Sequence, residues 1–199
     1  MKHLNTNLSS YNIILGSKSP RRKEILKKIG LKFTVQKIEF DEKADFSKDI
    51  EHVAQSISKL KSESYINLNE DDILICADTI VSVQNEIFGK PKSKDEAFTM
   101  LKKLSGKRHK VTTACTIKNI HKSITFYDTT FVSFKKLNKQ EINYYIENYN
   151  PLDKAGSYAI QEWIGLIGIN KIEGSYFNVV GLPSSKLYSE LIKFINEKN

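Results

Sequence analysis

The sequence Tyr11-Asn-Ile-Ile-Leu-Gly-Ser-Lys-Ser-Pro-Arg-Arg22 joins a short apolar run to the start of a helix. The apolar run ends at Gly16, and Pro20 suits a first helical turn because the N–H that proline lacks would have no partner there. Ser19 precedes the proline, where a hydroxyl can accept a hydrogen bond from a free backbone N–H. This stretch therefore predicts a strand, a tight turn and a helix.

The rest of the chain continues to alternate between strands and helices. Apolar residues three and four positions apart mark one face of each expected helix, whereas β-branched and aromatic runs mark the strands. No internal repeat, low-complexity linker or domain boundary interrupts the pattern, so we expect one α/β domain over residues 1–199. The expected strands cover 33–40, 73–77, 111–117, 124–134 and 166–172, and the expected helices begin near 20, 50, 94, 139 and 184.

The formal net charge of +8 raises the question of nucleic-acid binding. Only three of the 31 basic residues are arginines, namely Arg21, Arg22 and Arg108. A surface that binds nucleic acid usually favours arginine for bidentate phosphate and base contacts. We therefore interpret the excess of lysine as solvated surface and do not expect nucleic acid as a partner, although a basic nucleic-acid-binding module remains an alternative.

The sequence also predicts a cytoplasmic protein. Its first ten residues lack the basic start and apolar stretch of a signal peptide, and no apolar run is long enough to cross a bilayer. Cys76 and Cys115 have neither the spacing of a close pair nor that of a metal site, so both are expected to be small buried hydrophobes in a reducing compartment. We expect no membrane partner.

The turn at residues 16–22 is a candidate phosphate site. Free N–H groups and the helix dipole favour an anion at a helix start. Two of the three arginines lie here, where the guanidinium groups of Arg21 and Arg22 could hold phosphate oxygens. The alternative is an ordinary capped helix with solvated arginines.

Three carboxylates are further candidates. Asp78 follows the apolar run 73–77, which is expected to be a buried strand with Asp78 at its end, and ligands in open α/β sheets bind at the carboxyl ends of strands. It could position water or a metal, or simply cap a turn. Asp41 and Glu42 form an adjacent pair that is either solvated or holds a hard divalent cation in a cleft.

Three other polar residues each allow two interpretations, and a fourth, His109, has one. Lys90 precedes Pro91, so its ammonium is either aimed at a phosphate or part of a plain loop. Lys61 borders an apolar helix face, where snorkelling is the simpler explanation. Gln161 could bind a nucleobase edge or belong to a surface strand. His109 has no partner at metal-ligand spacing, so a structural hydrogen bond is expected.

Known catalytic motifs of other chemistries are missing from the sequence. There is no convincing Ser-His-Asp order, Walker-type loop or dinucleotide fingerprint, which excludes acyl transfer and redox chemistry. Six short motifs nevertheless occur in order between residues 13 and 187. They are Leu15-Gly-Ser-Lys-Ser-Pro-Arg-Arg22, Ala77-Asp-Thr-Ile-Val81, Gly89-Lys-Pro91, Leu104-Ser-Gly106 with His109, Asp153-Lys-Ala-Gly156, and Asn178-Val-Val-Gly-Leu-Pro183. Together these motifs resemble the Maf family.

The resemblance implies a Maf/ITPase-like two-lobed α/β fold, in which helices flank an elongated, twisted mixed sheet and a cleft separates the lobes. It implies an enzyme that hydrolyses nucleoside triphosphates to the monophosphate and pyrophosphate with a divalent cation, Mg²⁺ or Mn²⁺, and that forms a homodimer. Asp78 falls on the catalytic position, and Glu42 and Asp78 fall on the metal positions. The phosphate-binding positions are occupied by Ser17, Arg21, Lys61 and Lys90.

The resemblance also implies a preferred base. Asp153-Lys-Ala-Gly156 with Ile160-Gln161 is similar to the subgroup that acts on dTTP and UTP, in which the positions of Arg21, Thr79 and Gln161 select the base. Modified pyrimidine nucleotides are further possible substrates. The chain departs from the family pattern at Glu162, Asn150 and Ser62, which usually are glycine, glutamate and alanine; these changes affect the base pocket and leave Asp78 unaltered. Because the family is also linked to septum formation, a nucleotide-binding regulator of cell division with little turnover is the alternative.

Overall fold

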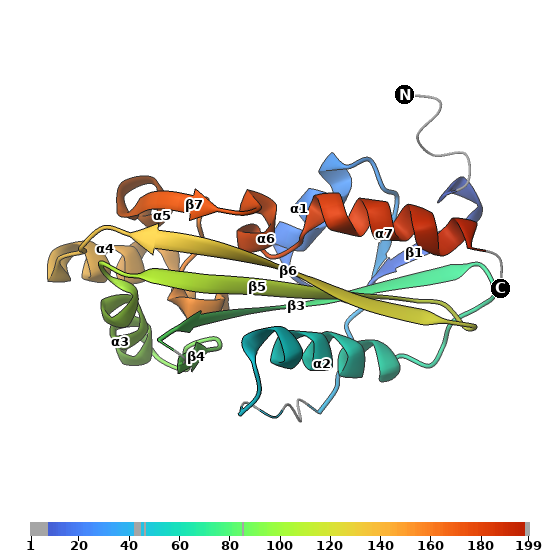
Figure 1. The fold of residues 1–199 in the computed structure, drawn as a ribbon, viewed down its shortest axis with the longest axis horizontal. Coiled ribbons are helices and arrows are strands. Elements are labelled where there is room, and N and C mark those ends of the chain that lie inside the picture. The colour runs from blue at the N-terminus through green and yellow to red at the C-terminus, as the bar shows by residue number, and fades with distance from the viewer. Residues whose placement is uncertain (1–7, 42–44, 46, 85, 198–199) are drawn as a thin grey trace.

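The computed structural model describes residues 8–41, 45, 47–84 and 86–197, which form one long mixed sheet with helices on both faces (Figure 1). In this part of the chain the sheet has seven strands in the order β2-β1-β3-β5-β6-β7, with β4 paired to β3. The elongated mixed α/β fold expected from the sequence is confirmed. The strands are β1 (Asn12–Leu15), β2 (Thr34–Val35), β3 (Asp72–Val83), β4 (Glu86–Phe88), β5 (Arg108–Lys118), β6 (Ser123–Phe134) and β7 (Ile169–Glu173).

The helices cover the two faces and one end of the sheet. In the view of Figure 1, α2 lies below the long strands, α1 and α7 lie above them, and α3 and α4 gather at one end. No described helix is long and apolar enough to cross a membrane. The helices are α1 (Pro20–Lys28), α2 (Ile50–Glu63), α3 (Lys94–Leu104), α4 (Lys139–Tyr149), α5 (Trp163–Gly168), α6 (Tyr176–Val180) and α7 (Ser184–Asn196), and short 3₁₀ turns are η1 (Leu8–Ser10), η2 (Pro151–Asp153) and η3 (Ala155–Ser157).

Two large apolar cores lie at opposite ends of the sheet. In the first, α1 and α7 bury residues such as Leu26 and Leu187 against β1, β3 and β5. In the second, α3, α4 and α5 bury residues such as Leu101, Tyr145 and Ile164 against the other ends of β3, β5 and β6. Because the long strands run through both cores, they hold the two ends of the molecule in a fixed relation.

The strand predicted over 33–40 is wrong in extent, since β2 contains only Thr34–Val35. Its neighbour β1 stops at Leu15, whose carbonyl accepts a last hydrogen bond from the N–H of Gln36 at 3.0 Å. Beyond that point no strand is available to pair with, so the chain leaves the sheet. The extent of β2 was thus decided by where β1 ends, which the local sequence does not reveal.

The strand predicted over 166–172 is also wrong in part, because 166–168 belong to helix α5 and β7 begins at Ile169. A short apolar run fits a strand and a buried helix equally well by periodicity. Here the helical turn buries Ile164 completely and leaves Leu166 80% exposed. Tertiary packing, rather than local propensity, therefore decides the form of this segment.

Candidate active site

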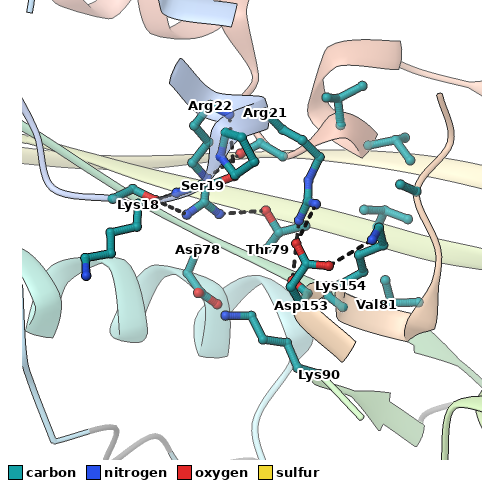
Figure 2. Close-up of a pocket in the computed structure, with 18 of the residues that line it drawn as sticks. Lys18, Ser19, Arg21, Arg22, Asp78, Thr79, Val81, Lys90, Asp153 and Lys154 are labelled. Atoms are coloured by element: carbon teal, nitrogen blue, oxygen red, sulfur yellow. Dashed lines mark hydrogen bonds and ion pairs between the residues drawn. The ribbon is translucent and has the colours of Figure 1, made fainter. Parts of the chain in front are cut away.

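A cavity of about 420 Å³ opens between the start of α1, the middle of β3 and the segment 153–161 (Figure 2). Every described residue to which the family resemblance gave a role lines this cavity, whereas the candidate carboxylate Asp41 is exposed and is not part of the lining. Glu42, the predicted second metal ligand, lies outside the described residues. The seven that meet here are Ser17, Arg21, Lys61, Asp78, Thr79, Lys90 and Gln161.

The wall of the cavity is strongly basic. Seven cationic side chains and only two carboxylates, Asp78 and Asp153, are among the described residues that line it. A concave surface with this excess of positive charge concentrates anions, and polyphosphates most of all. The cations are Lys18, Arg21, Arg22, Lys37, Lys61, Lys90 and Lys154.

The turn at residues 16–22, the candidate phosphate site, begins at Gly16, where β1 ends. A Cβ added to Gly16 would lie 2.6 Å from both Cys76 Sγ and Ile38 Cδ1, so only glycine fits. The buried Ser17 hydroxyl accepts hydrogen bonds from Ser19 N at 3.2 Å and from Arg22 Nη1 at 3.3 Å. Because both bonds use the oxygen as acceptor, the hydroxyl proton remains available to donate to a phosphate oxygen.

Arg22 connects the turn to the rest of the site, a role that the sequence did not indicate. Its guanidinium donates to Ala77 O at 2.8 Å, to Gly181 O at 2.8 Å, to Thr79 Oγ1 at 3.0 Å and to Ser17 Oγ at 3.3 Å. Burial lowers its pKa. Since four of its five N–H donors already bind the protein, Arg22 mainly fixes α1 to β3, and only one N–H is left for a phosphate oxygen.

The hydroxyl of Thr79 belongs to a directed hydrogen-bond chain. Thr113 donates its hydroxyl proton to Asn178 O at 2.8 Å, so in the 2.9 Å contact between the two threonine hydroxyls Thr79 is the donor. Thr79 in turn accepts from Arg22. A nucleobase can therefore use only the remaining lone pair of this hydroxyl, or the shape of the side chain.

Asp78 lies within β3 rather than at the end of a strand, so that detail of the prediction is wrong. β1 stops pairing with β3 at the contact of Leu15 with Ile75, three residues before Asp78. Between that point and Val81, where β4 begins to pair, β3 has a neighbouring strand on one side only, and there Asp78 is opposite Ala114 of β5. The half-buried carboxylate thus reaches the cavity at the carboxyl end of β1, and Figure 2 shows Lys90 pointing toward it.

Lys61 reaches the cavity from α2 and is not a snorkelling surface residue. Its Nζ lies 5.9 Å from the centre of the Phe40 ring. Burial lowers the pKa of Lys61, and the positive charge of Arg22 lowers it further. An anion bound beside this ammonium would therefore relieve an unfavourable concentration of positive charge.

Arg21 lies at the rim and forms an ion pair across the cavity. Its Nη1 is 3.1 Å from Asp153 Oδ2, and its Nη2 donates to Asp153 O at 3.4 Å. Burial acts to raise the pKa of Asp153, but hydrogen bonds and the charges of Lys154 and Arg21 outweigh it and hold that pKa below its ordinary value. The guanidinium of Arg21 is thus held at the mouth of the cavity.

The far wall is less polar and suits a planar group. Gln161 is exposed and lies in a turn after η3, so the surface-strand alternative for it is wrong. The apolar residues beside it present a surface against which a base could pack. They are Val81, Ala155, Tyr158, Ala159, Val179 and Val180.

His109 and the two cysteines are structural. His109 is 2% exposed, and its Nε2 forms a 2.7 Å hydrogen bond with the hydroxyl of Tyr158, as expected for a structural histidine. Burial lowers the pKa of His109 to about 4, so the ring is neutral at neutral pH. Burial also raises the pKa of the free thiols of Cys76 and Cys115 to about 11 and about 12. These thiols are un-ionised and unreactive.

A family profile described as Maf-like protein matches residues 12–194. The chain belongs to the Maf family. It is 46% identical over 189 residues to a protein of Phocaeicola vulgatus named dTTP/UTP pyrophosphatase, covering 94% of this chain and 98% of that one. A protein of Flavobacterium psychrophilum with the same name is 47% identical over 183 residues, covering 90% and 93%. In fold, the chain resembles the Ham1 protein of Staphylococcus aureus, with a TM-score of 0.51, 17% identity and coverage of 90% and 99%.

The Maf motifs seen in the sequence meet at the cavity, with one exception. The motif Asn178–Pro183 contributes through Gly181, whose φ of 121° few other residues adopt and whose carbonyl accepts from Arg22. The buried Asn178 fixes this segment by donating from Nδ2 to Val111 O at 2.9 Å. The exception is the motif that includes His109, which lies in the core at the end of the sheet and supports the cavity through Tyr158.

Proposed function

We propose that this chain is a nucleoside triphosphate pyrophosphatase that hydrolyses dTTP and UTP to the monophosphate and pyrophosphate. The observation that carries the proposal is the convergence of the seven predicted residues on one basic cavity. Relatives of nearly the full length of the chain, named dTTP/UTP pyrophosphatase, support the choice of reaction and base.

The triphosphate would lie along the basic wall. Ser17 can donate a hydroxyl proton, and Arg21, Lys61 and Lys90 supply positive charge from three different elements around the cavity. Each charge-assisted hydrogen bond to a phosphate oxygen contributes about 1.5–3 kcal/mol. Catalysis would thus consist mainly of positioning the anhydride and neutralising its charge.

Asp78 is the proposed catalytic residue. Of the two carboxylates among the described lining residues, Asp153 is bound by Arg21 and Lys154 at the rim. Asp78 instead lies on β3 among the proposed phosphate-binding residues, with Lys90 pointing toward it (Figure 2). In this place a carboxylate can orient a water molecule toward the bond between the α and β phosphates and accept its proton.

A divalent cation, Mg²⁺ or Mn²⁺, is part of the proposal. Within the described residues no group of three or more His, Cys, Asp and Glu side chains is placed to hold a metal ion. Nucleotide sites commonly hold Mg²⁺ through one or two carboxylates with substrate phosphates and water, and Asp78 in a phosphate-binding cavity fits such a site. When bound, the ion would neutralise phosphate charge as a Lewis acid.

Base selection is assigned to the far wall. Gln161 offers amide donors and an acceptor to a pyrimidine edge, and Arg21 and Thr79 shape the opposite side.

The expected homodimer and the cytoplasmic location remain predictions. Light scattering after gel filtration would test the homodimer.

The bond that is cleaved can be tested directly. Phosphorus NMR of dTTP incubated with the protein and Mg²⁺ is expected to show dTMP and pyrophosphate, with dTTP and UTP consumed faster than ATP, CTP and GTP. Glu190→Gln, which alters an ion pair on α7 outside the described cavity lining, should behave as wild type. Formation of dTDP and orthophosphate instead would contradict the proposal.

A further inference from the structure

A chain of alternating charges runs from the rim of the cavity into the protein. Arg21 Nη1 lies 3.1 Å from Asp153 Oδ2, and Lys154 Nζ lies 2.8 Å from Asp153 Oδ1. The same Nζ lies 3.4 Å from Glu162 Oε1, and the hydroxyl of Tyr145 donates to Glu162 Oε2. Five side chains from separate parts of the sequence are thus linked without interruption.

The centre of this chain is buried, which makes its balance of charge important. The side chain of Lys154 is only 7% exposed, and its ammonium also donates to the carbonyls of Tyr149 and Asn150 at 3.2 and 3.0 Å. A buried ammonium is tolerated only when carboxylates and acceptors compensate it. If Glu162 lost its charge, Asp153 would be the one carboxylate left in ion-pair contact with Lys154 among the described residues, and the hold of Asp153 on Arg21 would change.

The inner end of the chain fixes the wall that carries Gln161. The hydroxyl of Tyr145 accepts a hydrogen bond from Ala159 N at 3.1 Å while it donates to Glu162. The residues on both sides of 160–161 are therefore tied to the same hydroxyl. Tyr145 is itself completely buried, so this anchor is rigid.

We propose that Glu162 is a positioning residue for nucleotide selection, which orients Arg21 through Lys154 and Asp153 and fixes Gln161 through Tyr145. This inference rests on the proposed function for its choice of ligand. It gives a role to the position at which the chain departs from the usual glycine of the Maf pattern. The inference also requires that Arg21 and Glu162 are energetically coupled, although the series of charged side chains joins them only through Asp153 and Lys154.

A double-mutant cycle tests the coupling. The affinity for dTTP in which a methylene group replaces the α,β-bridging oxygen is measured by calorimetry for wild type, Arg21→Lys, Glu162→Gln and the double variant. We expect the combined loss of affinity to differ from the product of the single losses by about threefold or more. Additive losses, or no binding of the analogue to wild type, would overturn the inference.

Kinetics separate positioning from a general loss of structure. Glu162→Gln should raise KM for dTTP by about fivefold, with kcat within about twofold of wild type, because the binding wall changes and Asp78 does not. The matched control is Glu190→Gln, a carboxylate of similar exposure (24% against 23%) with one lysine partner at 2.9 Å, which should leave KM unchanged and show no coupling to Arg21. A fall in kcat with unchanged KM would contradict the proposed role.

Three further outcomes are distinguished. If Glu162→Gln does not fold, Glu162→Asp retains the charge but withdraws it from Lys154, and the same cycle should still show coupling; additivity would overturn the inference. If the analogue binds with the expected coupling but no triphosphate is hydrolysed, the positioning role stands and the proposed reaction fails. If hydrolysis occurs and the cycle is additive, only the positioning role fails.

Discussion

Replacing Arg22 with lysine should destabilise the protein by about 3 kcal/mol, whereas the same change at the neighbouring Arg21 should not. The guanidinium of Arg22 makes four hydrogen bonds, to Ser17, Ala77, Thr79 and Gly181. A lysine ammonium can keep the bond to Ala77 O but cannot span the other three acceptors. At about 1 kcal/mol for each lost bond, the free energy of unfolding falls by about 3 kcal/mol.

Arg21 provides the matched comparison because it has the same side chain one position away. Its partner Asp153 is 56% exposed, and ion pairs of this kind contribute about 0–1 kcal/mol to stability. Arg21→Lys should therefore leave the free energy of unfolding nearly unchanged. It should instead weaken nucleotide binding, since Arg21 lies at the mouth of the cavity.

The free energy of unfolding of both variants and of wild type is measured by urea titration followed by circular dichroism. For a chain of this length, 3 kcal/mol corresponds to a decrease in Tm of about 6–12 °C. A loss below about 1 kcal/mol for Arg22→Lys would refute the assigned role, because the four bonds would then contribute little. Equal losses for the two variants would refute the distinction between them.

Three further predictions follow from the same structure. Burial lowers the pKa of His109 from 6.5 to about 4, so as the pH falls the unfolded chain binds a proton at this residue before the folded protein does. The free energy of unfolding should therefore fall by about 3 kcal/mol between pH 6.5 and pH 4. In urea titrations at each pH, His109→Phe should reduce this dependence on pH. Since burial lowers the pKa of Lys61, kcat/KM should decline on the alkaline side before an ordinary lysine would lose its charge, and Lys61→Gln should abolish that decline in a pH–rate profile. Gly16→Ala should lower the free energy of unfolding by about 1–3 kcal/mol in urea titration, because its Cβ would overlap Cys76 and Ile38.

Local signals in the sequence predicted most of the helices and strands well. Ser19 accepts from the N–H of Arg22 at the start of α1, and Asn138 and Glu141 form a complete capping box at α4. Such caps depend on residues three positions apart, which are visible in a sequence. The extent of β2 depends instead on where its neighbour β1 ends, and the start of β7 depends on the tertiary packing of α5; both were predicted wrongly.

The contacts that organise the site could not be predicted in this way. Arg22 binds acceptors 55 and 159 residues away, and no local pattern distinguishes it from Arg21. Asp78 lies in the middle of a strand because β3 continues along β5, and it reaches the cavity because β1 ends early; both are features of topology rather than of the residues around it. Glu162 was recognised only as a departure from a family pattern, and its inward contacts with Lys154 and Tyr145 emerge from the folded structure.

The central claim is that Asp78 performs catalysis in a cavity that binds the triphosphate through other residues. Pyrophosphate release from dTTP with Mg²⁺, measured alongside dTTP-analogue binding for wild type and Asp78→Asn, tests this claim most directly. We expect the folded Asp78→Asn protein to bind the analogue and to lose at least about 100-fold in kcat, the scale of a missing general base. Activity close to wild type in that variant would contradict the account.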